Sequence, residues 1–408
     1  MAKTVNVLMY FLLAAYLLLN PIIPAGSKIS IIPDIILGLT IIICLIYSIK
    51  NRVTFLKNAK DFIKDYFGIS MIALLAIMFI SISYATDKTI ALKESFRFLS
   101  FVMLYFIIKY NTTKDQIKGL VDCYLFTFII INIAGIFQKV SGYGLPHLYF
   151  TPNTNIERIQ LTFGNPNTFA AFLVLGIFPI VMMMVNCKKI YQKVFYGIIV
   201  LLALSNIYFT GSRNSFVAIA IGGIAISVFY NWRFIVGLIG VGIIAIIFKG
   251  SRNRIIDIGN MSLDESRIKL WKLALKMIKD HPIRGVGNGN YSALYGTYVK
   301  KYNELMFINV PHYPSHNSYL KVEAELGIVG GLSLLGIIIN AIIKVKKVTT
   351  ELDDKFFKLF FIGFLASMIG FLVMNISDNF LFALPKVEVY FWFFIAAADS
   401  LLYKEKFE

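Results

Sequence analysis

The sequence predicts an all-α polytopic membrane protein with about 12 transmembrane helices and one large outer loop that contains short helices. Hydrophobic residues make up 58% of the 408 residues and charged residues only 15%, whereas soluble domains average about 45–50% and about 25%. The apolar residues form long runs without an ionised side chain, such as residues 5–23 and 67–85. Runs of about 18 or more apolar residues are typical of membrane-spanning helices. They do not alternate as the strands of a barrel do.

Twelve apolar segments are counted as spans. They are residues 5–24, 29–48, 66–84, 91–108, 118–138, 168–186, 191–210, 214–230, 233–249, 320–343, 356–376 and 381–403. The fourth contains Arg97 and the twelfth contains Lys386 and Glu388, which makes these two the least typical. The first lacks a small-residue cleavage site before Pro21, so we expect a retained helix rather than a signal peptide.

The distribution of Lys and Arg between the loops predicts the orientation. One set of connections carries 20 basic residues and the opposite set of short loops carries six. Because basic residues concentrate in cytoplasmic loops, we expect both termini in the cytoplasm. The formal net charge of +17 is then explained largely by topology, and no nucleic-acid partner is expected.

The same scheme divides the chain into three parts. Residues 1–249 hold spans one to nine, residues 250–319 form the longest polar stretch, and residues 320–408 hold the last three spans. The long polar stretch and the next longest, residues 139–167, both fall on the outer side. Functional residues concentrate on loops, so we expect the site where these two stretches meet the membrane.

A helix is predicted inside the large loop. The sequence Ser262-Leu-Asp-Glu265 has the form of a capping box, and Pro282 and Gly285 would end the helix. Its apolar stripe would consist of Ile268, Trp271, Leu275 and Ile278. Such a helix suits the membrane interface, with lysines toward the headgroups. Packing against the other spans is an equally good alternative.

Two arginines at expected helix starts are candidates for binding phosphate. Arg213 lies in the hairpin Thr210-Gly-Ser-Arg-Asn-Ser215, and Arg267 lies in the first turn of the loop helix. A guanidinium binds two phosphate oxygens at once, and a helix N-terminus adds free N–H groups. The alternatives are an interfacial arginine that reaches the headgroups at position 213 and an ion pair with Asp264 at position 267.

His316 is a candidate general base at the start of the tenth span, because an imidazole can accept a proton near neutral pH. A structural helix cap is the alternative. His312 and His316 could also hold a metal ion, but Pro314 disrupts the helical spacing, so no metal is expected. Glu325 follows nine residues later and could orient a base or hold a sugar.

The run Gly285-Val-Gly-Asn-Gly-Asn290 has the glycine content of a phosphate-binding loop. No strand precedes it and no Gly-Lys-Ser/Thr follows, so it is neither a dinucleotide fingerprint nor a P-loop. Arg284, which precedes it, could be merely solvated.

Four segments taken together resemble the O-antigen ligase and polymerase superfamily. They are, in chain order, Phe163-Gly-Asn-Pro-Asn167, Gly211-Ser-Arg-Asn214, Arg267 with Trp271 and the following Asp280-His-Pro-Ile-Arg-Gly-Val-Gly-Asn-Gly-Asn290, and His316-Asn-Ser-Tyr-Leu-Lys-Val-Glu-Ala-Glu-Leu-Gly-Ile-Val-Gly330. The resemblance covers roughly residues 150–335. Asn288 is a small departure, because the family's turn often reads Gly-Val-Gly-Pro-Gly-Asn.

The resemblance implies a glycosyltransferase of the O-antigen ligase type on the outer face of the bacterial cytoplasmic membrane. It would transfer a glycan from undecaprenyl diphosphate to a hydroxyl acceptor, such as lipid A core, without metal, nucleotide or other cofactor. By carry-over, Arg213 and Arg267 would hold the pyrophosphate and His316 would activate the acceptor. Residues expected to help bind substrate are Arg158, Asn165, Asn167, Arg284, Asn290, Asn317 and Glu325. The anomeric carbon would invert, since no paired outer carboxylates suit a double displacement.

Three other functions stay open. Repeat-unit polymerases of O-antigen or capsule and protein O-oligosaccharyltransferases belong to the same superfamily, and no acceptor signal separates them from ligases. A secondary transporter is the alternative of another class, with Arg97 and Glu388 as pathway residues. Against it, the sequence shows no inverted repeat, and the polar groups gather at one membrane face rather than at the midplane.

Overall fold

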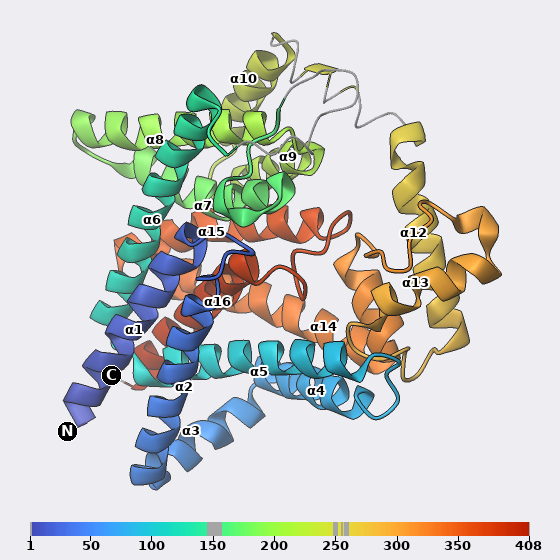
Figure 1. Cartoon of the computed structure of the whole chain (residues 1–408). Helices are drawn as coiled ribbons and strands as arrows, with labels where there is room; N and C mark the ends of the chain where they lie inside the picture. The colour runs from blue at the N-terminus through green and yellow to red at the C-terminus, as the bar shows by residue number, and fades with distance from the viewer. Residues whose placement is uncertain (1, 145–156, 248–251, 254–255, 257–260, 408) are drawn as a thin grey trace.

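The computed structural model describes residues 2–144, 157–247, 252–253, 256 and 261–407 (Figure 1). These residues form an all-helical protein, which confirms the predicted class. Seven helices are long and apolar enough to cross a membrane, or up to eight if a bent pair is one span. The structure therefore supports a multi-pass membrane protein, while the count of twelve spans stays a prediction.

The helices follow one another in an order that matches the predicted segments. They are α1 (Ala2–Ile22), α2 (Ile32–Lys50), α3 (Arg52–Lys64), α4 (Tyr66–Ser81), α5 (Lys88–Asn111), α6 (Lys114–Ser141), η1 (Leu161–Phe163), α7 (Pro166–Asn186), α8 (Ile190–Thr210), α9 (Arg213–Phe229), α10 (Phe234–Ile247), α12 (Met261–Asp280), α13 (Asn290–Lys301), η2 (Asn303–Leu305), α14 (Ser318–Glu351), α15 (Lys355–Met374) and α16 (Pro385–Phe407). The seven candidate spans are α1, α2, α6, α7, α8, α14 and α15. Shorter apolar helices include α9 and α10, and charged side chains interrupt α5 and α16.

The helices pack closely where glycine removes a side chain. The helix α15 lies against α7 and α9, while α14 lies against α4 and α16 against α5. A Cβ atom at Gly363 would lie 2.5 Å from Pro179 of α7, and one at Gly370 would lie 2.6 Å from the Ala218 carbonyl of α9. Helices in membranes associate largely through such small-residue contacts. These glycines therefore allow α15 to sit at the centre of the bundle.

The large predicted loop forms a small second core at one end of the bundle (Figure 1). Its helix begins at Met261, within one residue of the predicted start, but the side chains of the predicted capping box at 262–264 lie outside the described residues. Of the predicted stripe, Trp271 and Ile278 pack against this core, but the fully buried face of the helix is a different one. It consists of Leu270, Leu273, Ala274 and Met277. Ile268 and Leu275 of the predicted stripe are 37% and 52% exposed.

The helix α14 is broken near its start, a feature that its apolar sequence did not predict. Gly327 has φ 66° and ψ −165°, which is non-helical. A Cβ atom there would overlap with the carbonyl oxygen of Ile283. The N–H of Ile328 instead donates to the carbonyl of Pro282 at 2.9 Å. The break is therefore filled by the glycine turn of the loop.

The glycine turn supplies the remaining hydrogen bonds at the break. The N–H of Val286 donates to Ala324 at 3.0 Å, and the N–H of Gly287 donates to the Glu325 carbonyl at 2.8 Å. A Cβ atom at Gly285 would overlap with the Glu325 backbone. Unpaired backbone groups inside a membrane protein are costly. The glycine-rich sequence is thus explained by docking against α14 rather than by phosphate.

An ionic cluster lies at the end of the bundle opposite the second core. The Lys109 ammonium lies 2.9 Å from Asp399 and 3.2 Å from Asp61. The Lys344 ammonium lies 2.7 Å from Asp399 and 2.6 Å from Asp65. Asp61 lies on α3, which meets α4 at an angle of 89°. Residues predicted on one side of the membrane therefore lie together, although the side that each end faces stays a prediction.

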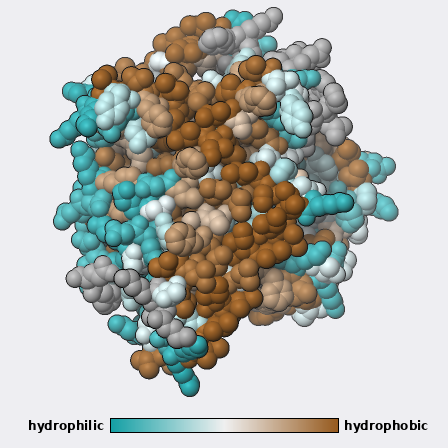
Figure 2. Space-filling view, turned by 60° about the vertical axis from the view of Figure 1, so that its left-hand side comes forward, coloured by the Kyte–Doolittle hydropathy of each residue, from teal (hydrophilic) through white to brown (hydrophobic). Residues whose placement is uncertain are grey.

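The surface between the two ends is broadly apolar. Figure 2 shows a continuous hydrophobic surface across the molecule, bordered by hydrophilic side chains. Large hydrophobic side chains that are exposed include Ile42, Leu201 and Ile239. Soluble monomers rarely expose such large apolar patches. This surface fits contact with lipid.

Candidate functional site

A histidine and an aspartate from distant parts of the chain form a pair at the N-terminal end of α14. The Nδ1 atom of His316 lies 3.2 Å from Oδ1 of Asp378. Asp378 is buried in the turn between α15 and α16, and the imidazole is half-buried. A carboxylate on one ring nitrogen fixes the proton there and leaves the other nitrogen as an acceptor. This arrangement suits a general base.

The backbone around His316 is held from several sides. Asn317 is the N-cap of α14 and accepts the N–H of Leu320 at 2.9 Å. The indole of Trp271, on α12, donates to the His316 carbonyl at 3.2 Å. His316 itself has φ 49°, a left-handed conformation that is uncommon outside glycine. Such strain persists where the surroundings impose it, which is common at functional sites.

Asp378 is held ionised by its neighbours. Burial alone would raise the pKa of its carboxyl, but the hydrogen bond and charge of His316 outweigh this. The positive charge of Arg267 and the N–H of Asn379 act in the same direction, so the pKa lies below its ordinary value. The amide of Asn167 donates to the other carboxylate oxygen at 3.2 Å. Every lone-pair direction of the carboxylate therefore faces a donor or a cation.

Three predicted arginines gather around this pair. Arg158 donates to the Thr210 carbonyl at 2.6 Å and to the Asn167 side chain at 2.7 Å. Arg267 donates to the Asn214 side chain at 3.4 Å, so the second turn of α12 faces the first turn of α9. Arg213 is the first residue of α9 and is half-buried. The predicted pyrophosphate site and the predicted base thus lie within one constellation.

Buried polar groups at two helix starts have no hydrogen-bond partner among the described residues. They include the hydroxyls of Ser212 at the start of α9 and Thr168 at the start of α7, which are 2% and 1% exposed. The side-chain nitrogen of Asn214 is likewise buried and has no hydrogen-bond partner among the described residues. Buried polar atoms are rarely left unsatisfied, and helix starts attract anions. An anionic ligand between α7 and α9 would satisfy these groups.

The remaining predicted binding residues hold the backbone. The Asn290 side chain accepts the N–H of Asp87 at 2.6 Å and donates to its carbonyl at 3.1 Å. The Glu325 carboxylate accepts the N–H groups of Gly289 and Tyr291 at 2.9 and 3.1 Å. Both residues thus fasten the glycine turn and the start of α13. Their contact with substrate stays a prediction.

Two more predicted residues are similarly engaged. Asn165 caps α7 and accepts the N–H of Asn167 at 2.7 Å. The guanidinium of Arg284 lies 5.2 Å from the ring centre of Tyr84, whose hydroxyl donates to the Arg284 carbonyl. Asn165 reaches the site only through Asn167. Arg284 lies with the glycine turn, away from Asp378.

Asp378 was missed by the sequence analysis, which considered Glu325 for the task of orienting a base. The run Ser377-Asp378-Asn379 is a polar turn between two apolar helices, α15 and α16. That placement was the signal that could have marked Asp378 as a candidate site residue. The partner could not be assigned, because 62 residues separate Asp378 from His316.

The intramembrane arginine that motivated a transporter hypothesis has a structural explanation. Arg97 pairs with Glu94 and donates to the Phe382 carbonyl at 2.7 Å. Phe382 belongs to the turn that carries Asp378 and has φ 65°. Glu388 accepts the indole N–H of Trp392 at 3.2 Å. Arg97 therefore braces the turn that positions the aspartate.

The fold and site combine a multi-pass helical bundle with a histidine–aspartate pair and nearby arginines. Residues 198–335 match the family model described as O-antigen ligase. This part of the chain is similar to that family, which confirms the resemblance and points to a glycan-processing enzyme. The match includes Arg213, Arg267 and His316, whereas Asp378, Arg158 and Asn167 lie beyond it.

A curated relative extends the similarity. The chain is 25% identical over 325 residues to the teichuronic acid biosynthesis protein TuaE of Bacillus subtilis (strain 168). The aligned region covers 74% of this chain and 64% of the relative. The chain thus spans slightly less than two thirds of the length of that relative.

Proposed function

We propose that this protein is a metal-independent glycosyltransferase that transfers a glycan from undecaprenyl diphosphate to a hydroxyl acceptor. The reaction would take place at the outer face of the bacterial cytoplasmic membrane, with both termini in the cytoplasm. The observation that carries the proposal is the His316–Asp378 pair, 3.2 Å apart, together with Arg213 at the start of α9 and Arg267 in the second turn of α12. The family of residues 198–335 supports the same reaction class.

The pair would act on the acceptor. With the Nδ1 proton directed to Asp378, the Nε2 atom of His316 accepts the proton of the acceptor hydroxyl. The acceptor oxygen forms a bond to the anomeric carbon of the donor. The bond between that carbon and the diphosphate oxygen breaks, and the oxygen leaves with the electron pair. A single displacement of this kind inverts the anomeric carbon.

The arginines would act on the leaving group. Negative charge develops on the diphosphate as its bond to the sugar breaks, and fixed cations stabilise that charge. Arg213 and Arg267 supply the guanidinium groups. The unpartnered hydroxyls of Ser212 and Thr168 would donate to the same oxygens. Undecaprenyl diphosphate then departs as the second product.

A growing polysaccharide is the acceptor that we favour. The relative named above is a teichuronic acid biosynthesis protein, and it therefore takes part in making a cell-wall polysaccharide. That similarity favours a polymerase over a ligase that acts on lipid A core. Protein glycosylation has no specific support.

A reconstitution experiment tests the reaction. Purified protein in liposomes receives an undecaprenyl diphosphate-linked repeat unit and one acceptor at a time: a second repeat unit, lipid A core or a peptide. We expect release of undecaprenyl diphosphate only with an acceptor, and chain extension with the repeat unit. Transfer to lipid A core alone would establish the ligase instead. Donor movement across the bilayer without release would contradict glycosyl transfer altogether.

A further inference from the structure

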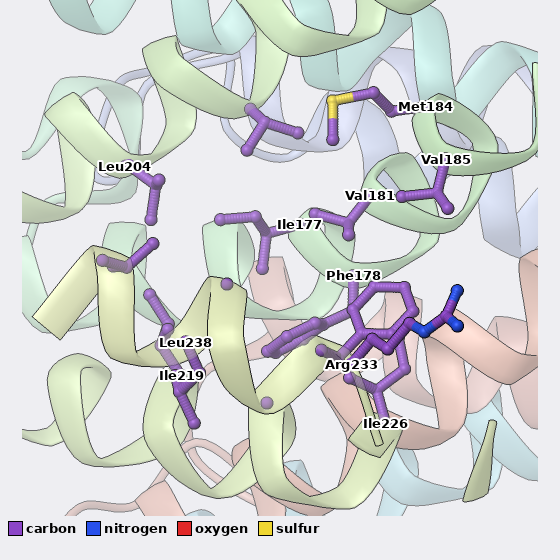
Figure 3. Close-up of a pocket in the computed structure, with 15 residues that line it drawn as sticks. Ile177, Phe178, Val181, Met184, Val185, Leu204, Ile219, Ile226, Arg233 and Leu238 are labelled. Carbon is purple, nitrogen blue, oxygen red and sulfur yellow. The ribbon is translucent and has the colours of Figure 1, made fainter. Parts of the chain in front are cut away.

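A cavity of about 400 Å³ lies between α7, α8, α9 and α10 (Figure 3). Its walls are apolar and include Phe178, Leu204, Ile226 and Leu238. Arg233 is the single charged residue in the lining, and Figure 3 shows it at one side of the cavity, beside Phe178 and Ile226. Cavities of this size accommodate small organic ligands or lipid chains.

The cavity is separate from the candidate active site. Arg213 stands at the start of α9, whereas Ile226 lies near its end, about 20 Å away at 1.5 Å per residue. Arg233 follows the end of α9 in the connection to α10. The cavity therefore lies toward the end of α9 that the loop charges assign to the cytoplasm.

Positive charge surrounds this end of α9. No ion pair involving Arg233 is found among the residues that the structure describes. The Lys346 ammonium lies 6.0 Å from the ring centre of Phe229, the last residue of α9. An apolar cavity with a cation in its lining is complementary to an anionic amphiphile. The cytoplasmic leaflet presents such lipids.

The helices around the cavity also expose apolar side chains. Leu201 on α8 is 64% exposed, and Ile239 on α10 is 56% exposed. In a membrane these faces contact lipid directly. A lipid chain can therefore reach the cavity without first crossing water.

We propose that the cavity binds one hydrocarbon chain of an anionic phospholipid, whose headgroup is held by Arg233. The chain replaces bilayer contacts with those of the cavity wall, and the guanidinium adds a charged hydrogen bond to the phosphate. The lipid would fill the space between α10 and the other three helices. It would bind independently of the glycan donor and acceptor.

The chain offers matched variants that fill the cavity or leave it open. Leu204 and Leu201 both lie on α8, but only Leu204 lines the cavity. Likewise, Gly237 lines it whereas Gly240 of the same helix does not, and a Cβ atom at either glycine meets nothing within 4 Å. Leu204→Trp and Gly237→Phe would thus occupy the cavity. Leu201→Trp and Gly240→Phe are the controls.

Photocrosslinking of the purified protein provides the test. The probe is phosphatidylglycerol with a diazirine in one acyl chain, compared with phosphatidylcholine that carries the same chain. We expect wild-type protein to be labelled on α8–α10 peptides and phosphatidylglycerol to be preferred. Each cavity-filling variant should lose at least about tenfold of this labelling, because the chain loses its burial. The two control variants should be labelled as wild type.

The headgroup is tested separately. Arg233→Gln should bring phosphatidylglycerol labelling down to the phosphatidylcholine level, while Arg52→Gln on α3 should change nothing. Equal labelling of Leu204→Trp, Gly237→Phe and wild type would overturn the proposal. Displacement of the probe by undecaprenyl diphosphate would also overturn it, because the cavity would then hold the donor's tail. None of these results depends on glycosyl transfer.

Discussion

The Nδ1 atom of His316 lies 3.2 Å from Oδ1 of Asp378, so the imidazole at the start of α14 is oriented by the turn between α15 and α16. The same carboxylate accepts a hydrogen bond from Asn167, at the start of α7. Helix starts that are distant in sequence are thereby joined through one side chain. The candidate base depends on the assembly of the whole bundle.

Asp378→Asn should lower kcat by about 10²–10⁴-fold, because the amide no longer fixes the imidazole tautomer and cannot stabilise its positive charge. Donor binding should stay within a few-fold of wild type, which a misfolded variant would not show. Steady-state kinetics and a donor-lipid binding assay measure the two effects. Asp353→Asn, an exposed aspartate near the other end of α15, is the control. Unchanged kcat in Asp378→Asn would assign the pair a structural role only.

His316→Ala should remove a similar share of the rate, about 10²–10⁴-fold, while the protein still binds the donor. His312→Ala is the matched control. His312 is exposed, and its Nδ1 atom lies 3.4 Å from the Ser292 carbonyl, within the loop. If His316→Ala keeps the wild-type rate, the remaining explanation is that His316 is a structural helix cap. Equal losses in both variants, together with inhibition by a chelator, would revive the metal hypothesis.

The substitutions Arg213→Lys and Arg267→Lys should each weaken donor binding. The reason is that an ammonium group cannot bind two phosphate oxygens at once, as a guanidinium does. We expect kcat/KM to fall by at least about tenfold in each, since a charge-assisted hydrogen bond is worth roughly 1.5–3 kcal/mol. Arg52→Lys, on the exposed face of α3, should behave as wild type. If both Arg213→Lys and Arg267→Lys keep the wild-type kcat/KM, neither arginine binds the leaving group.

The lowered pKa of Asp378 predicts how folding stability depends on pH. The unfolded chain binds the carboxyl proton more tightly than the folded protein, so the carboxylate's contribution is full above its ordinary pKa of about 3.9. It is lost as pH falls through the folded-state pKa. The difference in melting temperature between wild type and Asp378→Asn should therefore be constant from about pH 5 to 8 and shrink below about pH 4. A difference that persists unchanged to pH 3 would contradict the ion pair.

The orientation of the chain can be tested with single cysteines in a background without Cys44, Cys123 and Cys187. Lys300→Cys in α13 and Lys60→Cys in α3 are both at exposed positions. We expect an impermeant thiol reagent to label the first in intact cells and the second only after permeabilisation. Labelling in the reverse pattern would place the candidate site in the cytoplasm.

The sequence predicted local features well because they depend on local physical properties. Each of the twelve apolar segments coincides with a helix, and Asn317 and His316 stand at the start of α14 as expected. The resemblance also identified Arg213, Arg267 and His316 as site residues, and the structure brings them to one region. Their catalytic roles stay predictions.

Features that depend on distant contacts were not predicted. The break at Gly327 lies inside an apolar run, and its backbone groups are satisfied by Pro282 and the following turn. The most buried face of α12 could not be chosen, because neighbouring apolar stripes of this helix fit equally well and the contacts with α13 and α14 decide between them. Asp378 was missed for the same reason, since its partner is far away in sequence.

The docking of the glycine turn against α14 has a consequence for the order in which the protein is made. The turn leaves the ribosome before the carbonyl groups of Ala324 and Glu325 that receive it. Asp378, which orients His316, is synthesised later still. A nascent chain that ends before residue 378 therefore contains the arginines but lacks the carboxylate that pairs with His316. The proposed site is thus complete only after α15 and the turn that follows it have been synthesised.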